Sequence, residues 1–233
     1  MEKEHRYRAT DRMSDLITDN FSLLMVMSRF GLKLGFGDQT VKEVCETQGV
    51  DMHTFLAVAN FVNERQLAYE DDEQVSLSSL MEYLKNAHTY FLDFNLPTIR
   101  RKLIEALNLA SSDNVGMLIL KFFDEYVEEV RNHMEYENNE VFAYVEEVLE
   151  GRLSTSYNIV TYSSRHEEID SKLNELKNII IKYYPESGNN NLMNSVLYDI
   201  FNCEQDLISH GEVEDYMFVP AVAREERRLK DGR

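Results

Sequence analysis

The spacing of apolar residues along 113–149 is the feature that most restricts what this chain can fold into. One set of side chains recurs there at steps of three and four residues: Ile119, Phe122, Tyr126, Val130, His133, Glu137, Val141, Tyr144 and Val148. Such steps follow one face of an α-helix, whereas a strand repeats every two residues. We therefore predict one long helix that buries this face and ends at Gly151.

Three further segments, about 78–109, 156–184 and 191–228, follow the same period. Pro97 is expected to bend or break the first of them. The chain holds only three prolines and nine glycines, and strand-like alternation is scarce. Because short loops make neighbouring helices antiparallel, we predict an all-α protein with an up-down-up-down four-helix bundle over 76–228.

The region ahead of the bundle, 1–72, is interpreted as a small helical N-terminal domain of three short helices. Asp38 and Asp51 are the expected N-terminal caps of two of these helices. The acidic segment EDDEQVS at 70–76 has the composition of a linker. The sequence thus predicts two domains, 1–72 and 76–228.

A His and a Glu interrupt the buried face of the helix predicted at 113–149. His133 and Glu137 are four residues apart, and His210 and Glu214 repeat this HxxxE spacing on the apolar face of the last helix. A buried carboxylate costs several kcal/mol unless it is paired or bound to a metal. One HxxxE is a weak signal, but its recurrence on two inward faces needs a common explanation.

The two remaining long segments each add one inward histidine, His88 and His166. The gap from His88 to His133 and the gap from His166 to His210 differ by a single residue. We interpret this spacing as an internal repeat of two helical hairpins. A pseudo-twofold relation between the hairpins would bring four histidines and two glutamates together near the middle of the bundle.

Four imidazoles and two carboxylates favour iron or manganese. They suit zinc less well, because a structural zinc site closes at four ligands. Manganese or zinc is a possible substitute for iron. Six ligands fit two ions, each holding two histidines, with both carboxylates bridging. An added oxo or hydroxo bridge would leave one position open on each ion. The alternative is a metal-free bundle in which the six polar side chains only form hydrogen bonds, and each would then need another partner.

Two acidic residues are candidate hydrogen-bond partners of these histidines. Glu129 lies four residues before His133, and Asp206 lies four residues before His210. Metal-bound histidine usually donates its second ring N–H to such a group, which fixes the tautomer. The alternative is that both residues belong to a solvated acidic face.

The segments HMEYE, RHEEID and SHGEVEDYMFVP, together with His88, resemble the hemerythrin-like di-iron domain over about 76–222. Within it they are most similar to the RIC proteins, named for repair of iron centres. This resemblance implies a non-haem di-iron site, and it assigns the ligands as His88, His133, Glu137, His166, His210 and Glu214. Oxygen-carrying hemerythrins have a further histidine where this chain has Asp170, which favours the RIC-like branch.

The N-terminal segment SRFGLKLGFGDQTVKEVCETQGVDMHTFL resembles the short helical domain that precedes the bundle in RIC proteins. That domain carries adjacent cysteines in its glycine turn, and this chain has LGFG at the corresponding position, 34–37. A redox or metal-transfer step assigned to that cysteine pair is therefore not expected here. A docking or dimerising module is the preferred interpretation, with a homodimer as one form of it.

The charge and the cysteine content exclude several classes of protein. A formal net charge of −18 repels nucleic-acid phosphates and anionic membrane surfaces. The first residues lack the apolar core of a signal peptide, and no stretch is apolar for long enough to span a bilayer. The two cysteines, Cys45 and Cys203, do not make a disulfide framework. We expect a cytoplasmic protein without nucleic-acid or membrane partners.

The resemblance implies that the protein binds O2 or NO at two iron ions. Its expected role is repair of iron–sulfur clusters, with iron–sulfur proteins as partners, or defence against nitrosative and oxidative stress. A second hypothesis is a gas or redox sensor that acts through a protein partner without catalytic turnover, and the absent cysteines favour it. Whether the chain is an enzyme stays open at this point.

Overall fold

The computed structural model describes residues 6–64, 74–107, 114–153, 159, 166–184 and 189–232, and for 166–171 it describes the backbone alone. Across these ranges the regular structure is helical and no strand occurs. The all-α prediction is therefore confirmed. None of the helices in the described ranges is long and apolar enough to cross a membrane.

Contacts divide the chain into two compact units. The first unit comprises Met1–Ala87, Phe142–Tyr162 and Glu212–Arg233, and the second comprises His88–Val141 and Ser163–Gly211. Within the described residues, these boundaries fall inside a helix or at the junction of two consecutive helical segments. The division into domains at 1–72 and 76–228 stays a prediction, and residues 65–73, which include most of the expected linker, lie outside the described part.

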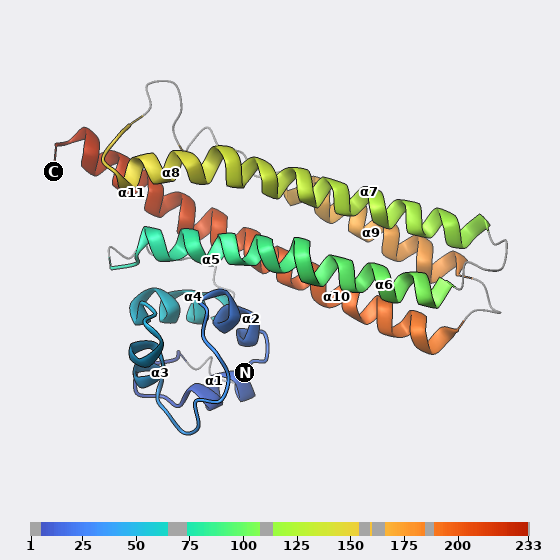
Figure 1. Cartoon of the computed structure of the whole chain (residues 1–233), viewed down its shortest axis with the longest axis horizontal. Coiled ribbons are helices and arrows are strands. Elements are labelled where there is room, and N and C mark those ends of the chain that lie inside the picture. Colours follow the sequence, from blue (N-terminus) through green and yellow to red (C-terminus); the bar gives the residue numbers. More distant parts are fainter. Residues whose placement is uncertain are drawn as a thin grey trace. The chain divides into compact units, whose positions relative to one another are not determined.

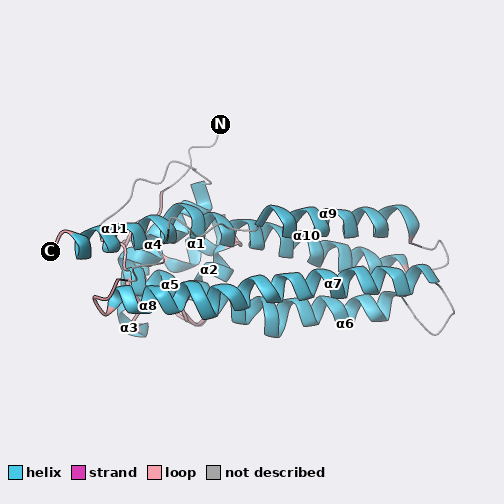
Figure 2. Cartoon of the chain, turned by 90° about the horizontal axis from the view of Figure 1, so that it is seen from above, coloured by secondary structure: helices cyan, strands magenta, loops and turns pink. Residues whose placement is uncertain are grey.

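The second unit is built from parallel and antiparallel helices that run side by side (Figures 1 and 2). Its elements are η1 (Tyr90–Asn95), α6 (Leu96–Leu107), α7 (Asn114–Tyr136), η2 (Glu137–Val141), α9 (His166–Tyr183) and most of α10 (Asn190–Val213). The direction of the chain alternates from α6 to α7, α9 and α10 (Figure 1). This is the predicted up-down-up-down bundle.

The buried faces of these helices follow the predicted period with small shifts. Phe123 is 1 % exposed and takes the core position that the sequence pattern gave to Phe122. In α10 the buried apolar residue near the start is Met193, at 2 % exposure. Because the helical period is not a whole number, two adjacent apolar residues compete for one place on the face.

Pro97 does not break the first long helix. The helix α5 (Leu77–Thr89) continues through η1 into α6, where Pro97 is the second residue. The segment η1 is π-helical, and the Leu96 N–H bonds to the Phe91 carbonyl, five residues back. Proline removes one backbone N–H donor. The hydrogen bond from the Leu96 N–H to the carbonyl five residues back keeps the chain helical just before it. The expected bend or break is replaced by a change of helix type.

Residues 6–64 of the first unit form four helices, where the sequence predicted three over 1–72. They are α1 (Met13–Asp19), α2 (Leu23–Arg29), α3 (Val41–Gln48) and α4 (Met52–Glu64). The extra break is at Asn20, whose backbone is extended. Its side-chain oxygen accepts a hydrogen bond from the Ser22 N–H at 3.0 Å. This local bond stabilises a turn in place of a continued helix.

The caps of α3 and α4 show which polar residues start a helix. The Thr40 side chain accepts from the Glu43 N–H, and Glu43 accepts from the Thr40 N–H, so a capping box begins α3. Asp38, the predicted cap, does not have this role. These hydrogen bonds from Thr40 lower the pKa of Glu43. The predicted cap of α4 is confirmed, because Asp51 accepts from the Thr54 N–H at 2.7 Å.

The N-terminal helices contact α5 within the first unit. The Asn86 side chain donates to the Arg29 carbonyl at 2.9 Å. Buried Arg29 reaches the Tyr83 hydroxyl at 3.4 Å, and the rings of Phe30 and Tyr83 lie 5.0 Å apart. The end of α2 therefore packs on α5 two to five residues before His88.

The helices α8 (Phe142–Leu149) and α11 (Val219–Lys230) also pack in the first unit. Glu226 on α11 is 3 % exposed. Its Oε1 accepts from the Tyr144 hydroxyl at 2.7 Å and from the Ile159 N–H at 2.8 Å. A buried carboxylate is tolerated where hydrogen bonds replace its lost hydration, and here they join three separate segments.

Cys45 is expected to resist alkylation in the folded protein. It is fully buried, and burial first and Asp51 second raise the pKa of its thiol to about 11. At pH 8 only about one thiol in a thousand is then the reactive thiolate. Mass spectrometry after brief iodoacetamide treatment should find Cys45 unmodified in native protein and modified in urea. Rapid native labelling would contradict this, and would reopen a redox role for the N-terminal region.

Candidate metal centre

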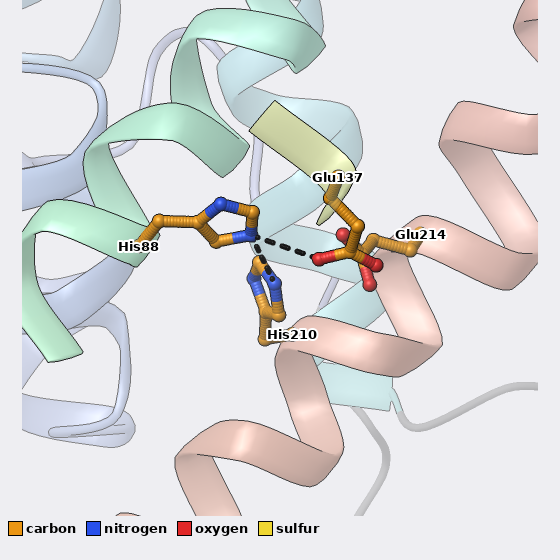
Figure 3. Close-up of side chains that lie close together, drawn as sticks. All are labelled: His88, Glu137, His210 and Glu214. Carbon is orange, nitrogen blue, oxygen red and sulfur yellow. Dashed lines mark hydrogen bonds and ion pairs between the residues drawn. The ribbon is translucent and has the colours of Figure 1, made fainter. Parts of the chain in front are cut away.

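Four buried polar side chains converge on one point (Figure 3). They are His88, Glu137, His210 and Glu214, each no more than 2 % exposed. One possible ligand atom from each lies within 4.8 Å of the others. Glu214 follows His210 by one helical turn, as the HxxxE spacing predicts. The sequence thus identified the residues of this cluster, although it gave no distances.

The two histidines of the cluster direct the same type of atom at each other. His88 Nε2 lies 3.2 Å from His210 Nε2 and 3.3 Å from Glu137 Oε2. The contact is a hydrogen bond when one of the two nitrogens carries the ring proton. A cation bound at this point would instead take the lone pairs of both nitrogens.

The carboxylate of Glu137 faces two histidines. Its Oε2 is directed at His88, and its Oε1 lies 3.2 Å from His133 Nε2. The His133 side chain is 8 % exposed. A single buried carboxylate therefore spans two imidazoles from two helices. This is the geometry of a bridging group, with one oxygen available on each side.

His166 is the first residue of α9. Its side chain lies outside the described part of the chain. The structure therefore brings together four of the six predicted residues and connects His133 to them through Glu137. The place of the His166 side chain stays a prediction.

Each cluster helix changes to π-helix at or just after a cluster residue. The segment η1 begins two residues after His88, η2 begins at Glu137, and η4 (Glu214–Phe218) begins at Glu214. In η4 the Val219 N–H bonds to the Glu214 carbonyl, five residues back. Short π-helical segments are frequent at functional sites. Sequence reasoning missed these π-helical segments. One extra residue in a turn moves the apolar positions by one residue, and this change is not distinctive in the sequence.

Sequence reasoning also missed the hydrogen-bond partner of the second ring nitrogen of His88, Nδ1. His88 Nδ1 lies 3.0 Å from Asn138 Oδ1. Sequence reasoning favoured an acidic partner four residues before a histidine, and Asn138 is neither acidic nor at that spacing. The candidate Glu129 forms an ion pair with Lys172 on α9 instead. The role suggested for Asp206 stays a prediction.

An aromatic side chain packs against the cluster. Phe91 is fully buried and its ring lies 5.9 Å from the His210 ring, nearly edge-on. An environment of low polarity strengthens the attraction between a cation and two carboxylates. It also makes those carboxylates costly to keep charged without a cation.

The donor set suits a divalent transition metal. Imidazole nitrogens and carboxylate oxygens, without thiolate, favour iron, manganese or zinc over copper(I). The cluster is buried, its nitrogens converge, and its two carboxylates balance positive charge. On these observations the residues fit a metal centre.

Comparison with known proteins identifies the region that holds the cluster. A family model, the hemerythrin HHE cation binding domain, matches residues 79–222. The match covers more than half of the chain and includes all six predicted ligands. No curated protein matches the chain.

Proposed function

The chain belongs to the hemerythrin HHE cation-binding domain family, and from this premise we propose that it is a non-haem di-iron protein of the RIC type. The observation that carries the proposal is the position of Glu137. Its two oxygens face His88 and His133 at 3.3 and 3.2 Å. A carboxylate placed between two imidazoles suits a pair of ions better than a single ion.

The proposed ligands divide between the two ions. His88 and His210 hold one ion, because their Nε2 atoms are 3.2 Å apart. His133 and His166 would hold the other, and the carboxylates of Glu137 and Glu214 would be shared by the two. When bound, two iron ions supply reversible binding of a small diatomic molecule and one-electron redox change. The protein orients the imidazoles, balances charge with two carboxylates and packs Phe91 against His210.

The proposed biological role is repair of iron–sulfur clusters or defence against nitrosative and oxidative stress in the cytoplasm. The ligand would be NO or O2, and the partners would be iron–sulfur proteins. The RIC-like sequence of 28–56 ahead of the bundle supports this assignment. The glycine turn reads LGFG, so no step is assigned to a cysteine pair there.

Iron analysis of protein prepared without oxygen tests the proposal. Wild-type protein loaded with Fe(II) should hold about two irons per chain, the count that six ligands of this type support. Exposure to NO should change its visible spectrum. His133→Ala and His210→Ala should each lose iron, whereas His53→Ala, a histidine of α4, should not. A wild-type chain without iron, or variants that retain it fully, would refute a di-iron centre at these residues.

A second candidate function is a gas or redox sensor, and one contact favours it. Asn86, two residues before His88, donates to the carbonyl of Arg29 at the end of α2. A shift of the helix that carries His88 would therefore reach the N-terminal helices directly. If the protein is a sensor, NO should change its oligomeric state or its capture of a partner, and NO should not be consumed. Steady consumption of NO would favour an enzyme.

A further inference from the structure

Two consecutive residues of η2 contact the two ring nitrogens of one histidine. Glu137 Oε2 lies 3.3 Å from His88 Nε2, and Asn138 Oδ1 lies 3.0 Å from His88 Nδ1. His88 is 1 % exposed, whereas Asn138 is exposed to solvent. The imidazole is thus held on its inner side by the carboxylate and on its outer side by the amide.

The π-helical backbone explains how neighbouring residues can share one target. Adjacent side chains of an α-helix point about 100° apart, so Glu137 and Asn138 would normally face different directions. A π-helix has more residues per turn and therefore a smaller rotation between neighbours. Because η2 begins at Glu137, both side chains reach the same ring.

A metal bound at His88 Nε2 would determine where the ring proton must be. A neutral imidazole carries one N–H, and a nitrogen that binds a metal must not carry it. His88 Nε2 points into the cluster, so the proton belongs on Nδ1. The Nδ1–H then donates to Asn138 Oδ1, and the amide oxygen holds both the tautomer and the ring orientation.

We propose that Asn138 is a positioning residue that fixes His88 as an Nε2 metal ligand. The proposal rests on the metal-binding function proposed above and adds a residue to it. A partner of metal-bound histidine is often a carboxylate, which makes the ring a stronger donor. A neutral amide orients the ring without adding negative charge. In this chain Asn138 therefore orients His88 without raising the affinity for the ion as much as a carboxylate would.

The test compares three variants by metal release and by exchange of the His88 Nδ1 proton. Asn138→Ala should release Fe(II) or Zn(II) to a chelator about tenfold faster than wild type, the lower end of the range for such partners. Asn138→Asp should restore slow release or make it slower. Asn139→Ala is the matched control, because Asn139 is the exposed neighbour in the same π-helical segment. It should release the ion at the wild-type rate.

Nuclear magnetic resonance of ¹⁵N-labelled histidine gives a readout that does not need the metal. In metal-free wild-type protein the Nδ1 proton of His88 should exchange slowly with water, because it donates to Asn138 Oδ1; its signal is assigned by its loss in His88→Gln. In Asn138→Ala this proton should exchange faster. Equal behaviour of Asn138→Ala and Asn139→Ala in both measurements overturns the proposal. If wild-type protein binds no metal, the proposed function fails, and exchange of the Nδ1 proton alone decides the role of Asn138.

Discussion

Replacing Glu137 and Glu214 together with Gln is expected to abolish metal binding and, at the same time, to stabilise the metal-free protein. Both carboxylates are 1 % exposed, and they belong to one cluster of possible ligand atoms within 4.8 Å. Without a cation, charge on both carboxylates is unfavourable, because two like charges would repel each other and would lack the hydration they have in the unfolded chain. Neutral amides of nearly the same shape remove this repulsion, but they cannot balance a bound cation.

Urea denaturation with and without metal measures both effects. In chelator, the double variant should have a free energy of unfolding about 1–3 kcal/mol above that of wild type, the size expected for relieving a poorly solvated buried group. Fe(II) at a hundred times its dissociation constant should add about 2.7 kcal/mol to wild type and nothing to the variant. Glu135→Gln with Asp215→Asn, two exposed neighbours, is the control and should change neither value. A metal-free variant less stable than wild type would show that the carboxylates have a structural role.

Loss of one partner of the buried Lys177–Glu204 ion pair should cost about 3–5 kcal/mol of stability. Lys177 on α9 and Glu204 on α10 are each 7 % exposed, and the Lys177 ammonium also lies 4.8 Å from the centre of the Phe201 ring. Lys177→Met leaves the Glu204 carboxylate buried without its cation. The double variant Lys177→Met with Glu204→Leu removes both charges, so it should recover most of the loss.

The ion pair of Arg100 and Asp124 is the matched comparison on the surface of the same unit. Its side chains are 44 % and 42 % exposed, and such pairs contribute up to about 1 kcal/mol. Arg100→Met should therefore have a small effect in the urea measurement. If Lys177→Met costs no more than Arg100→Met, water reaches the buried pair, and the packing of α9 on α10 is looser than the structure indicates.

The fold and most of the site could be predicted because both depend on periodic residue positions. A His and a Glu four residues apart lie on one face of any helix, so HxxxE predicted that His210 and Glu214 point the same way. Recurrence of the pattern in two hairpins then predicted that His88, Glu137, His210 and Glu214 converge. The apolar period likewise predicted the helices, with uncertainty only between adjacent residues such as Phe122 and Phe123.

The features that could not be predicted are those where the local period changes. A π-helical segment is a single extra residue in a turn, and nothing in the letters ENNEV separates it from α-helix. Asn138 was overlooked for this reason, since in an α-helix it would point away from His88. The true cap of α3 depends on which of Asp38 and Thr40 has the extended backbone of a cap. The conformation of the turn before α3 decides which of the two residues is the cap, and the residue types alone do not predict that conformation.

The separation of the cluster residues along the chain has a consequence for biosynthesis. His88 and His210 touch although they are 122 positions apart in the sequence. A nascent chain still attached to the ribosome therefore cannot assemble the cluster until its last long helix has left the exit tunnel. Metal insertion must therefore follow the synthesis of residue 210, and a product truncated before that residue would lack a complete binding site.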